Sequence, residues 1–151
     1  MTGREPLEKA ELASDVWRTI VDFFWASREQ SAQVLQELNI TPGHMKTLLL
    51  LDPLEPKPMG ALAEAMSCDA SNVTWLVDRL EERGLVERRM LETDRRVKTV
   101  RLTALGAKTK KSLLERLYEP PEALLALDRR DLESLKSSVS KLPVIESALG
   151  L

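Results

Sequence analysis

The sequence predicts a mainly α-helical protein with one small β-hairpin. Apolar residues recur at three- and four-residue steps through most of the chain, the spacing of a half-buried helix. The pattern changes only after Gly84, where residues 85–90 and 98–102 are typical of two short strands. A length of 151 residues fits one ordinary domain, or one protomer of a small oligomer.

The first predicted helix runs from residue 7 to about residue 38. Its apolar stripe consists of Leu7, Ala10, Ala13, Val16, Trp17, Ile20, Val21 and Phe24. The stripe broadens over residues 20–25, where Phe23 and Trp25 add two more large side chains. One half-buried helix does not need so many large apolar groups, so we expect a second buried face against a partner subunit.

Three more helices are predicted before Gly84. Thr41 is a typical N-cap and Pro42 is favoured at the first helical position, so a helix begins there. A proline-rich connection leads to a short helix over residues 60–66. Asp69 is expected to cap the next helix, which reaches Arg83, and Gly84 ends it in the left-handed conformation.

The two strands enclose a polar, charged tip at residues 91–97. Thr103 is then expected to cap a helix that continues to about Tyr118, and Asp128 begins a last helix. The apolar stripe of that last helix is Leu132, Leu135, Val139 and Leu142. Two short helices joined by a tight turn and followed by a β-hairpin form a winged helix-turn-helix.

The predicted organisation is one compact domain per protomer with three segments. Residues 1–40 form an N-terminal dimerisation helix, and residues 104–151 form C-terminal helices that complete the dimer interface. Residues 41–103 form the winged helix-turn-helix module, with a recognition helix at 69–83 and a wing at 85–102.

Composition and charge exclude several classes of protein. One cysteine and one histidine rule out a disulfide framework and a Cys/His zinc site, and no metal or cofactor is expected. No apolar run approaches the ~18–20 residues of a membrane-spanning helix, and no secretory h-region is present, so we expect a cytoplasmic location. No nucleophile–base pair or phosphate-binding glycine loop assembles, so the sequence does not predict an enzyme.

The charge distribution favours a polyanionic partner. The whole chain has a formal charge of −2, whereas residues 83–101 hold seven cations against three anions. A compact basic segment on an acidic body is typical of a nucleic-acid contact surface.

The helix at 69–83 has the pattern of a recognition helix. Its buried stripe is Val73, Leu76, Val77 and Leu80, and short polar side chains lie near the start of its other faces. A recognition helix enters the major groove by its N-terminal residues, where such side chains can bind bases. An ordinary amphipathic helix is the alternative. Trp75 lies on the outward face, where a thymine methyl and sugar edge, a neighbouring subunit or a loop must cover it.

The hairpin is the second predicted DNA contact. Its tip places Arg95 and Arg96 beside Asp94, and arginine enters a narrow, negative minor groove at little desolvation cost. A solvated turn is the alternative. Further cations on the flanking strands would neutralise phosphates, namely Arg88, Arg89, Lys98 and Arg101.

Three runs of the sequence, residues 59–66, 69–86 and 94–106, resemble the MarR family of homodimeric winged-helix transcription regulators. The resemblance implies a dimer built from the terminal helices and a wing whose Asp94-x-Arg96 pair sends arginine into the minor groove. It also implies DNA contacts by Ser71, Asn72, Thr74 and Arg79. Trp75 departs from the family pattern, in which this position is more often small or basic.

The resemblance also implies a cleft for small aromatic or phenolic anions between the DNA module and the dimer helices. The candidate lining is Trp17, Ile20, Phe24, His44, Met45 and Leu48, with Arg18 as the counter-charge. Core or dimer interface is the alternative for most of these residues, and His44 is expected near the surface. Some relatives sense peroxide through a cysteine in the first helix, which has none here, so we expect Cys68 to be structural.

Together these observations predict a homodimeric, sequence-specific regulator, specifically a repressor that a small aromatic or anionic ligand releases. Its partner is double-stranded DNA with a pseudo-palindromic operator, because paired recognition helices lie about one DNA turn apart. Two alternatives stay open: a winged helix used for protein–protein contact, and a DNA-binding regulator without an effector.

Overall fold

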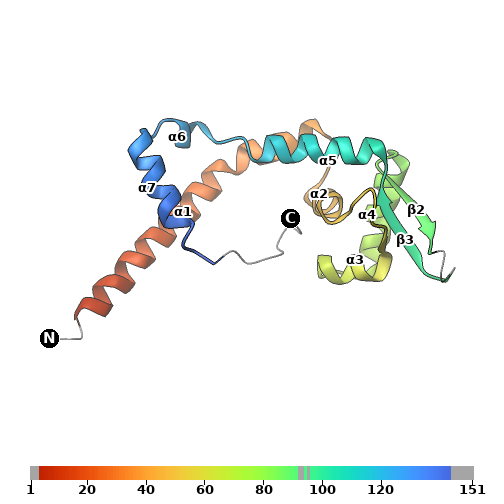
Figure 1. The fold of residues 1–151 in the computed structure, drawn as a ribbon, viewed down its shortest axis with the longest axis horizontal. Helices are drawn as coiled ribbons and strands as arrows, with labels where there is room; N and C mark the ends of the chain where they lie inside the picture. The colour runs from red at the N-terminus through yellow and green to blue at the C-terminus, as the bar shows by residue number, and fades with distance from the viewer. Residues whose placement is uncertain (1–3, 92–93, 95, 144–151) are drawn as a thin grey trace. The chain divides into compact units, whose positions relative to one another are not determined.

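The computed structural model describes residues 4–91, 94 and 96–143, and its contacts divide the chain into two units, Met1–Gln33 and Val34–Leu151. The elements in chain order are α1 (Arg4–Glu37), α2 (Pro42–Leu50), β1 (Lys57–Pro58), α3 (Met59–Met66), α4 (Ala70–Glu82), β2 (Val86–Met90), β3 (Lys98–Leu102), α5 (Ala104–Leu117), α6 (Glu122–Leu125) and α7 (Arg129–Val139). Figure 1 shows α2, α3 and α4 gathered beside the hairpin of β2 and β3. The predicted fold class, mainly α-helical with a small β-hairpin, is confirmed.

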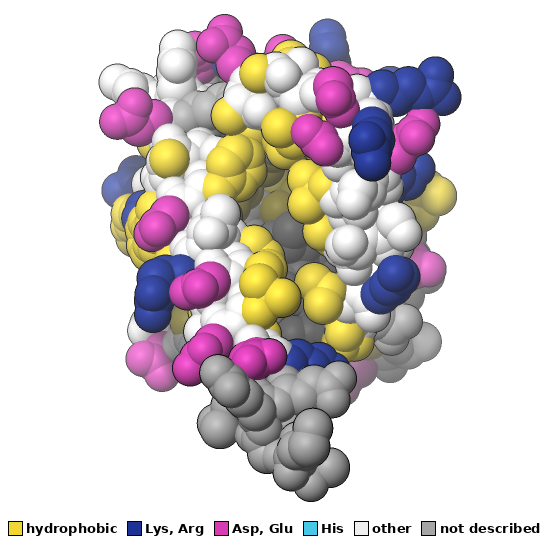
Figure 2. Space-filling view, turned by 90° about the vertical axis from the view of Figure 1, so that its left-hand side faces the viewer, with side chains coloured by type: hydrophobic (Ala, Val, Ile, Leu, Met, Phe, Trp, Pro, Cys, Tyr) yellow, Lys and Arg dark blue, Asp and Glu magenta, His cyan; other side chains and the backbone are white. Residues whose placement is uncertain are grey.

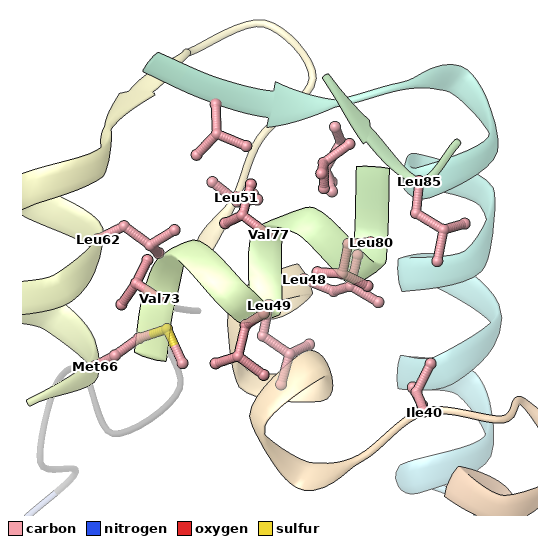
Figure 3. Packing of buried hydrophobic residues seen from close by; sticks show 14 of the residues in the cluster. Ile40, Leu48, Leu49, Leu51, Leu62, Met66, Val73, Val77, Leu80 and Leu85 are labelled. Atoms are coloured by element: carbon pink, nitrogen blue, oxygen red, sulfur yellow. The ribbon is translucent and has the colours of Figure 1, made fainter. Parts of the chain in front are cut away.

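The core of the second unit lies where α2, α3 and α4 meet the sheet and α5. Its fully buried side chains come from each of these elements: Leu48, Leu62, Val73, Val77, Leu80, Val100 and Leu113. Figure 3 shows Leu62 and Met66 of α3 facing Val73 of α4. The predicted stripe of α4 is therefore the buried one, and burying it fixes which side of the helix is exposed.

Capping residues explain where several helices begin. The Thr41 side chain accepts a hydrogen bond from the backbone N–H of His44, and the His44 side chain accepts one from the backbone N–H of Thr41, which completes a capping box. Thr103 caps α5 through the N–H of Gly106. Asp69 occupies the N-cap position of α4, but its side chain makes no capping hydrogen bond, so its predicted capping role is wrong.

The sheet contains one strand more than the predicted hairpin. Its order is β1-β3-β2, and β1 pairs antiparallel with β3 through Lys57 opposite Val100. The hairpin itself pairs Val86 with Leu102 and Met90 with Lys98. A two-residue strand has no hydrophobic period, and the four-residue helix α6 has none either, so neither was predicted.

Two glycines are required by backbone geometry. Gly84 has φ of 66°, the left-handed conformation predicted for the end of α4. Gly106 lies in the first turn of α5, where an added Cβ would be 1.8 Å from the carbonyl oxygen of Leu85. The absence of a side chain at Gly106 lets α5 pack directly on the start of the wing.

The helices α1 and α7 each carry several large apolar side chains that are exposed. In the first unit these are Leu12, Val16, Trp17, Ile20, Phe23, Phe24 and Trp25 of α1. In the second unit they are Leu132, Leu135 and Val139 of α7, with Leu142 just beyond the helix. Figure 2 shows hydrophobic side chains, drawn in yellow, exposed on the face that it presents.

Candidate nucleic-acid interface

The exposed side of α4 carries every predicted DNA contact of the recognition helix. Ser71, Asn72, Thr74, Trp75 and Arg79 are all exposed. The Thr74 hydroxyl donates to the carbonyl of Ala70 at 2.8 Å, which leaves its oxygen free to accept a hydrogen bond from a base amino group. This surface therefore combines small polar groups with one indole, as the sequence predicts.

Trp75 rests on a histidine from α2. The rings of Trp75 and His44 stack with centroids 5.6 Å apart and planes 21° from parallel. The guanidinium carbon of Arg79 lies 5.9 Å from the indole centroid. His44 is only 8% exposed, so the prediction that it lies near the surface is wrong. Nothing in the sequence pattern indicates the stack, because the two residues are 31 positions apart.

Burial and nearby charge favour the neutral form of the His44 imidazole. Burial lowers the pKa of His44, and the guanidinium groups of Arg83 and Arg79 lower it further. Nδ1 accepts the N–H of Thr41 at 3.2 Å, so the proton of the neutral ring is on Nε2. Nε2 is buried and has no hydrogen-bond partner in the described part of the chain.

The tip of the wing presents cations to solvent. The Asp94 carboxylate accepts the backbone N–H of Arg96 at 3.0 Å and so shapes the turn. The side chains of Arg96 and Lys98 are exposed and form no ion pair with any residue that the structure describes. Arg95, which was also predicted to bind DNA, lies outside the described residues.

Arg88 is in a different environment from the one expected of a phosphate contact. Its guanidinium lies 2.5 Å from the Glu81 carboxylate and 2.6 Å from that of Asp78, and it donates to the carbonyl of Thr74 at 3.3 Å. Its backbone N–H also donates to Glu81. Arg88 therefore ties β2 to α4, with its charge balanced by two carboxylates.

Glu87 organises the other cations at the base of the wing. Its carboxylate lies 2.5 Å from Nε of Arg101 and 3.2 Å from the guanidinium of Arg89. The hydrogen bond from Arg101 lowers the pKa of Glu87, and the one from Arg89 acts in the same direction. Arg89 is thus exposed as predicted but paired with an acid.

A hollow of about 520 Å³ lies between α4, the wing and the start of α3. It is lined by Pro58, Met59, Gly60, Thr74, Asp78, Arg88, Arg96, Val97 and Lys98. A second, mostly apolar hollow of about 310 Å³ lies against α5 and is lined by Asp52, Pro53, Leu102, Ala107, Lys110, Lys111, Leu114 and Glu115. The first hollow adjoins the predicted DNA contacts.

None of the residues predicted to bind a ligand lines these two hollows. Leu48 is fully buried in the core, and Met45 packs against that core. Trp17, Ile20 and Phe24 are exposed on α1, and Arg18 beside them pairs with Asp15 at 3.6 Å. Cys68 is half-buried and packs against the core, in agreement with a structural thiol.

No helix among the described residues is both long and apolar enough to cross a bilayer. Within the same residues, no group of three or more His, Cys, Asp or Glu side chains is placed to hold a metal ion.

Comparison with known proteins decides the family. The family model for the MarR family matches residues 40–98. The organic hydroperoxide resistance transcriptional regulator of Bacillus subtilis (strain 168) is 32% identical over 120 residues, covering 78% of this chain and 79% of the relative. The chain belongs to the MarR family. An uncharacterised HTH-type transcriptional regulator of B. subtilis, YfiV, is 38% identical over 80 residues, 53% of this chain and 50% of that protein.

Solved structures of MarR-type proteins share the fold. YusO from B. subtilis aligns with a TM-score of 0.75 at 24% identity, covering 87% of this chain and 94% of YusO. Wild-type MarR from E. coli in the apo form aligns with a TM-score of 0.69 at 25% identity, covering 83% and 95%. An S. aureus MepR mutant bound to an oligodeoxyribonucleotide gives 0.65 at 24% identity, covering 85% and 94%. This MarR-family chain is thus a DNA-binding transcription regulator, and its relatives are regulators rather than enzymes.

Proposed function

We propose that the chain acts in the cytoplasm as a homodimeric, sequence-specific repressor that binds a pseudo-palindromic operator. The observation that carries the proposal is the common side of α4 and the wing. The exposed residues Ser71, Asn72 and Thr74 lie on α4, and the exposed cations Arg96 and Lys98 lie at the wing tip. Both sets border the same hollow through Thr74, Arg96 and Lys98. Polar groups on a helix beside a cationic hairpin suit a major groove and the adjacent minor groove.

In this proposal the residues have separate tasks. Ser71, Asn72, Thr74 and Arg79 contact bases and backbone in the major groove, and Asp94 shapes the turn that directs Arg96 into the minor groove. Arg88 holds the wing against α4 and leaves phosphate binding to the exposed cations. The test is selection of binding sites from a random DNA pool, followed by affinity measurements over a range of salt. Recovery of an inverted repeat with steep salt dependence supports the proposal, and a flat salt response refutes it in favour of protein contact.

The exposed apolar side chains of α1 and α7 support a homodimer. Four of them, Leu132, Leu135, Val139 and Leu142, repeat at helical spacing and are 38–58% exposed. A monomer rarely leaves such a row in water, whereas subunit interfaces use one. The variant Leu135→Glu should give the mass of one protomer in light scattering, while Lys136→Glu, on the same helix, should keep that of a dimer. If Leu135→Glu still has the mass of a dimer, α7 is not part of the subunit interface.

The hollow beside α4 supports release by a small anionic ligand. Its volume of about 520 Å³ lies in the range of small-molecule sites, and Arg88, Arg96 and Lys98 line it. A carboxylate bound there would engage the wing cations in competition with DNA. Benzoate is the probe: it should weaken operator binding more than acetate at equal ionic strength. Equal effects of the two salts would support a regulator without an effector. Because the single cysteine packs against the core, the proposal includes no peroxide response.

A further inference from the structure

Trp75 is an apolar side chain in a polar surface of α4. It is 48% exposed, and its neighbours one turn away on the helix are Ser71, Asn72, Asp78 and Arg79, all of them exposed. The indole is not part of the buried cluster of the core. A half-exposed indole among polar groups is unfavourable in water, and a partner that covers it gains that free energy.

The indole is held in place by the groups beneath it. His44 stacks on it at 5.6 Å, and His44 is itself fixed by the capping box with Thr41. Arg79 approaches the same ring at 5.9 Å. A ring that is already ordered loses little conformational entropy when it binds. The stack therefore presents one rigid apolar surface at the sixth residue of α4, within the part of a recognition helix that reaches base edges.

Only one group on the major-groove edges of DNA is apolar, the 5-methyl group of thymine. We propose that Trp75 is a specificity-determining residue that binds a thymine 5-methyl group in each half-site, and that His44 is the positioning residue behind it. This inference rests on the proposed function of α4. It adds a chemical requirement that the polar residues of the helix do not impose, a methylated pyrimidine at one fixed position in each half of the operator.

The experiment replaces each thymine of the selected operator by deoxyuridine, which removes only the methyl group. Affinity is measured by fluorescence anisotropy for the wild-type dimer and for Trp75→Ala. At one symmetric position the wild type should bind about fourfold more weakly for each methyl removed, the fold-change that corresponds to one buried methyl group. The factor should be the same at low and high salt, because no charge is involved.

In Trp75→Ala the difference between thymine and deoxyuridine at that position should disappear. Trp75→Gln also lacks the indole, and it should give the same result if the alanine variant folds poorly. Ser71→Ala is the matched control on the same surface of α4 and should keep the fourfold difference. If Trp75→Ala retains the discrimination, or if no thymine matters to the wild type, the inference is overturned.

The role of His44 has its own readout. The variant His44→Asn removes the ring but keeps a side chain that can accept the N–H of Thr41. We expect it to reduce the thymine preference from about fourfold to about twofold with an unchanged salt slope. Equal loss of affinity for both operators would show that His44 only stabilises the fold. Normal DNA binding without thymine discrimination refutes only this inference, whereas absence of DNA binding refutes the proposed function as well.

Discussion

Replacing Arg88 tests whether this arginine positions the wing or binds DNA. The variant Arg88→Met keeps most of the aliphatic stem and removes the guanidinium. Three contacts are lost, to Asp78, Glu81 and the Thr74 carbonyl. The Arg88 side chain is 23% exposed and the two carboxylates are 49% and 40% exposed, so solvent screens the pairs. At about 0.2–1 kcal/mol for each screened contact, the free energy of unfolding should fall by about 1–2 kcal/mol.

Arg96→Met is the matched comparison. Its guanidinium is exposed and unpaired within the described residues, so the free energy of unfolding should stay within about 0.5 kcal/mol of the wild type. Urea titrations measure both values. In DNA binding, the slope of log affinity against log salt should decrease by about 0.9 for each guanidinium lost from the groove in Arg96→Met. Arg88→Met should weaken binding with no change in slope, because its charge is already balanced.

Equal reductions of the salt slope in the two variants would refute the positioning role of Arg88. An unchanged free energy of unfolding in Arg88→Met would refute the energetic reasoning, since it would show that the three side-chain contacts contribute nothing to holding β2 against α4.

Three further predictions concern stability. Gly106→Ala should lower the free energy of unfolding by about 3 kcal/mol, because its Cβ would lie 1.8 Å from the Leu85 carbonyl oxygen. The control Gly60→Ala, whose Cβ would have nothing within 4 Å, should be neutral or stabilise the protein by up to about 1 kcal/mol. Equal melting curves for the two variants would contradict this prediction. Because burial lowers the pKa of His44, the unfolded state takes up the proton first, so stability should decrease as pH falls below about 6.5, and less so in His44→Asn. Urea titrations between about pH 7.5 and 5.5 measure how much stability the wild type and His44→Asn each lose. The loss due to His44 must vanish above about pH 7.5. Leu76→Ala should cost about 2–5 kcal/mol in unfolding free energy as a core truncation, and a loss below about 1 kcal/mol would show that α4 does not depend on its buried stripe.

Most of the fold was predictable because its elements are long enough to show a period or carry a cap. The stripe of α4 and the threonines that begin α2 and α5 are local signals, and the structure confirms them. β1 was not predictable, because two residues form a strand only through their pairing with β3. The side-chain role of Asp69 failed for a related reason: its position was correct, but the hydrogen bond depends on side-chain geometry that spacing does not determine.

The residues of the candidate site were predictable as a surface but not as partners. Helical spacing places Ser71, Asn72 and Thr74 outward whatever the rest of the chain does. The burial of His44 and its stacking on Trp75 depend on how α2 crosses α4, which sequence spacing does not encode. Helical spacing and the order of the elements predicted the wing and the recognition helix, and the resemblance to the family implied which of their residues contact DNA. The structure adds which side chains these residues contact within the protein.

The basic segment at residues 83–101 contains two kinds of cation. Arg83 donates to the carbonyls of Leu38 and Asn39 at 2.9 and 2.7 Å, and Arg88 and Arg101 bind carboxylates of α4 and β2. These arginines hold the module together. Arg96 and Lys98 face solvent at the far end of the hairpin, without an acidic partner in the described ranges. The net charge of this segment is therefore larger than the charge that is available to bind DNA phosphates. A guanidinium already paired with a carboxylate releases few counterions from DNA. The salt slope should follow the unpaired cations of the tip, and a slope that required the paired arginines as well would mean that the ion pairs break when DNA binds.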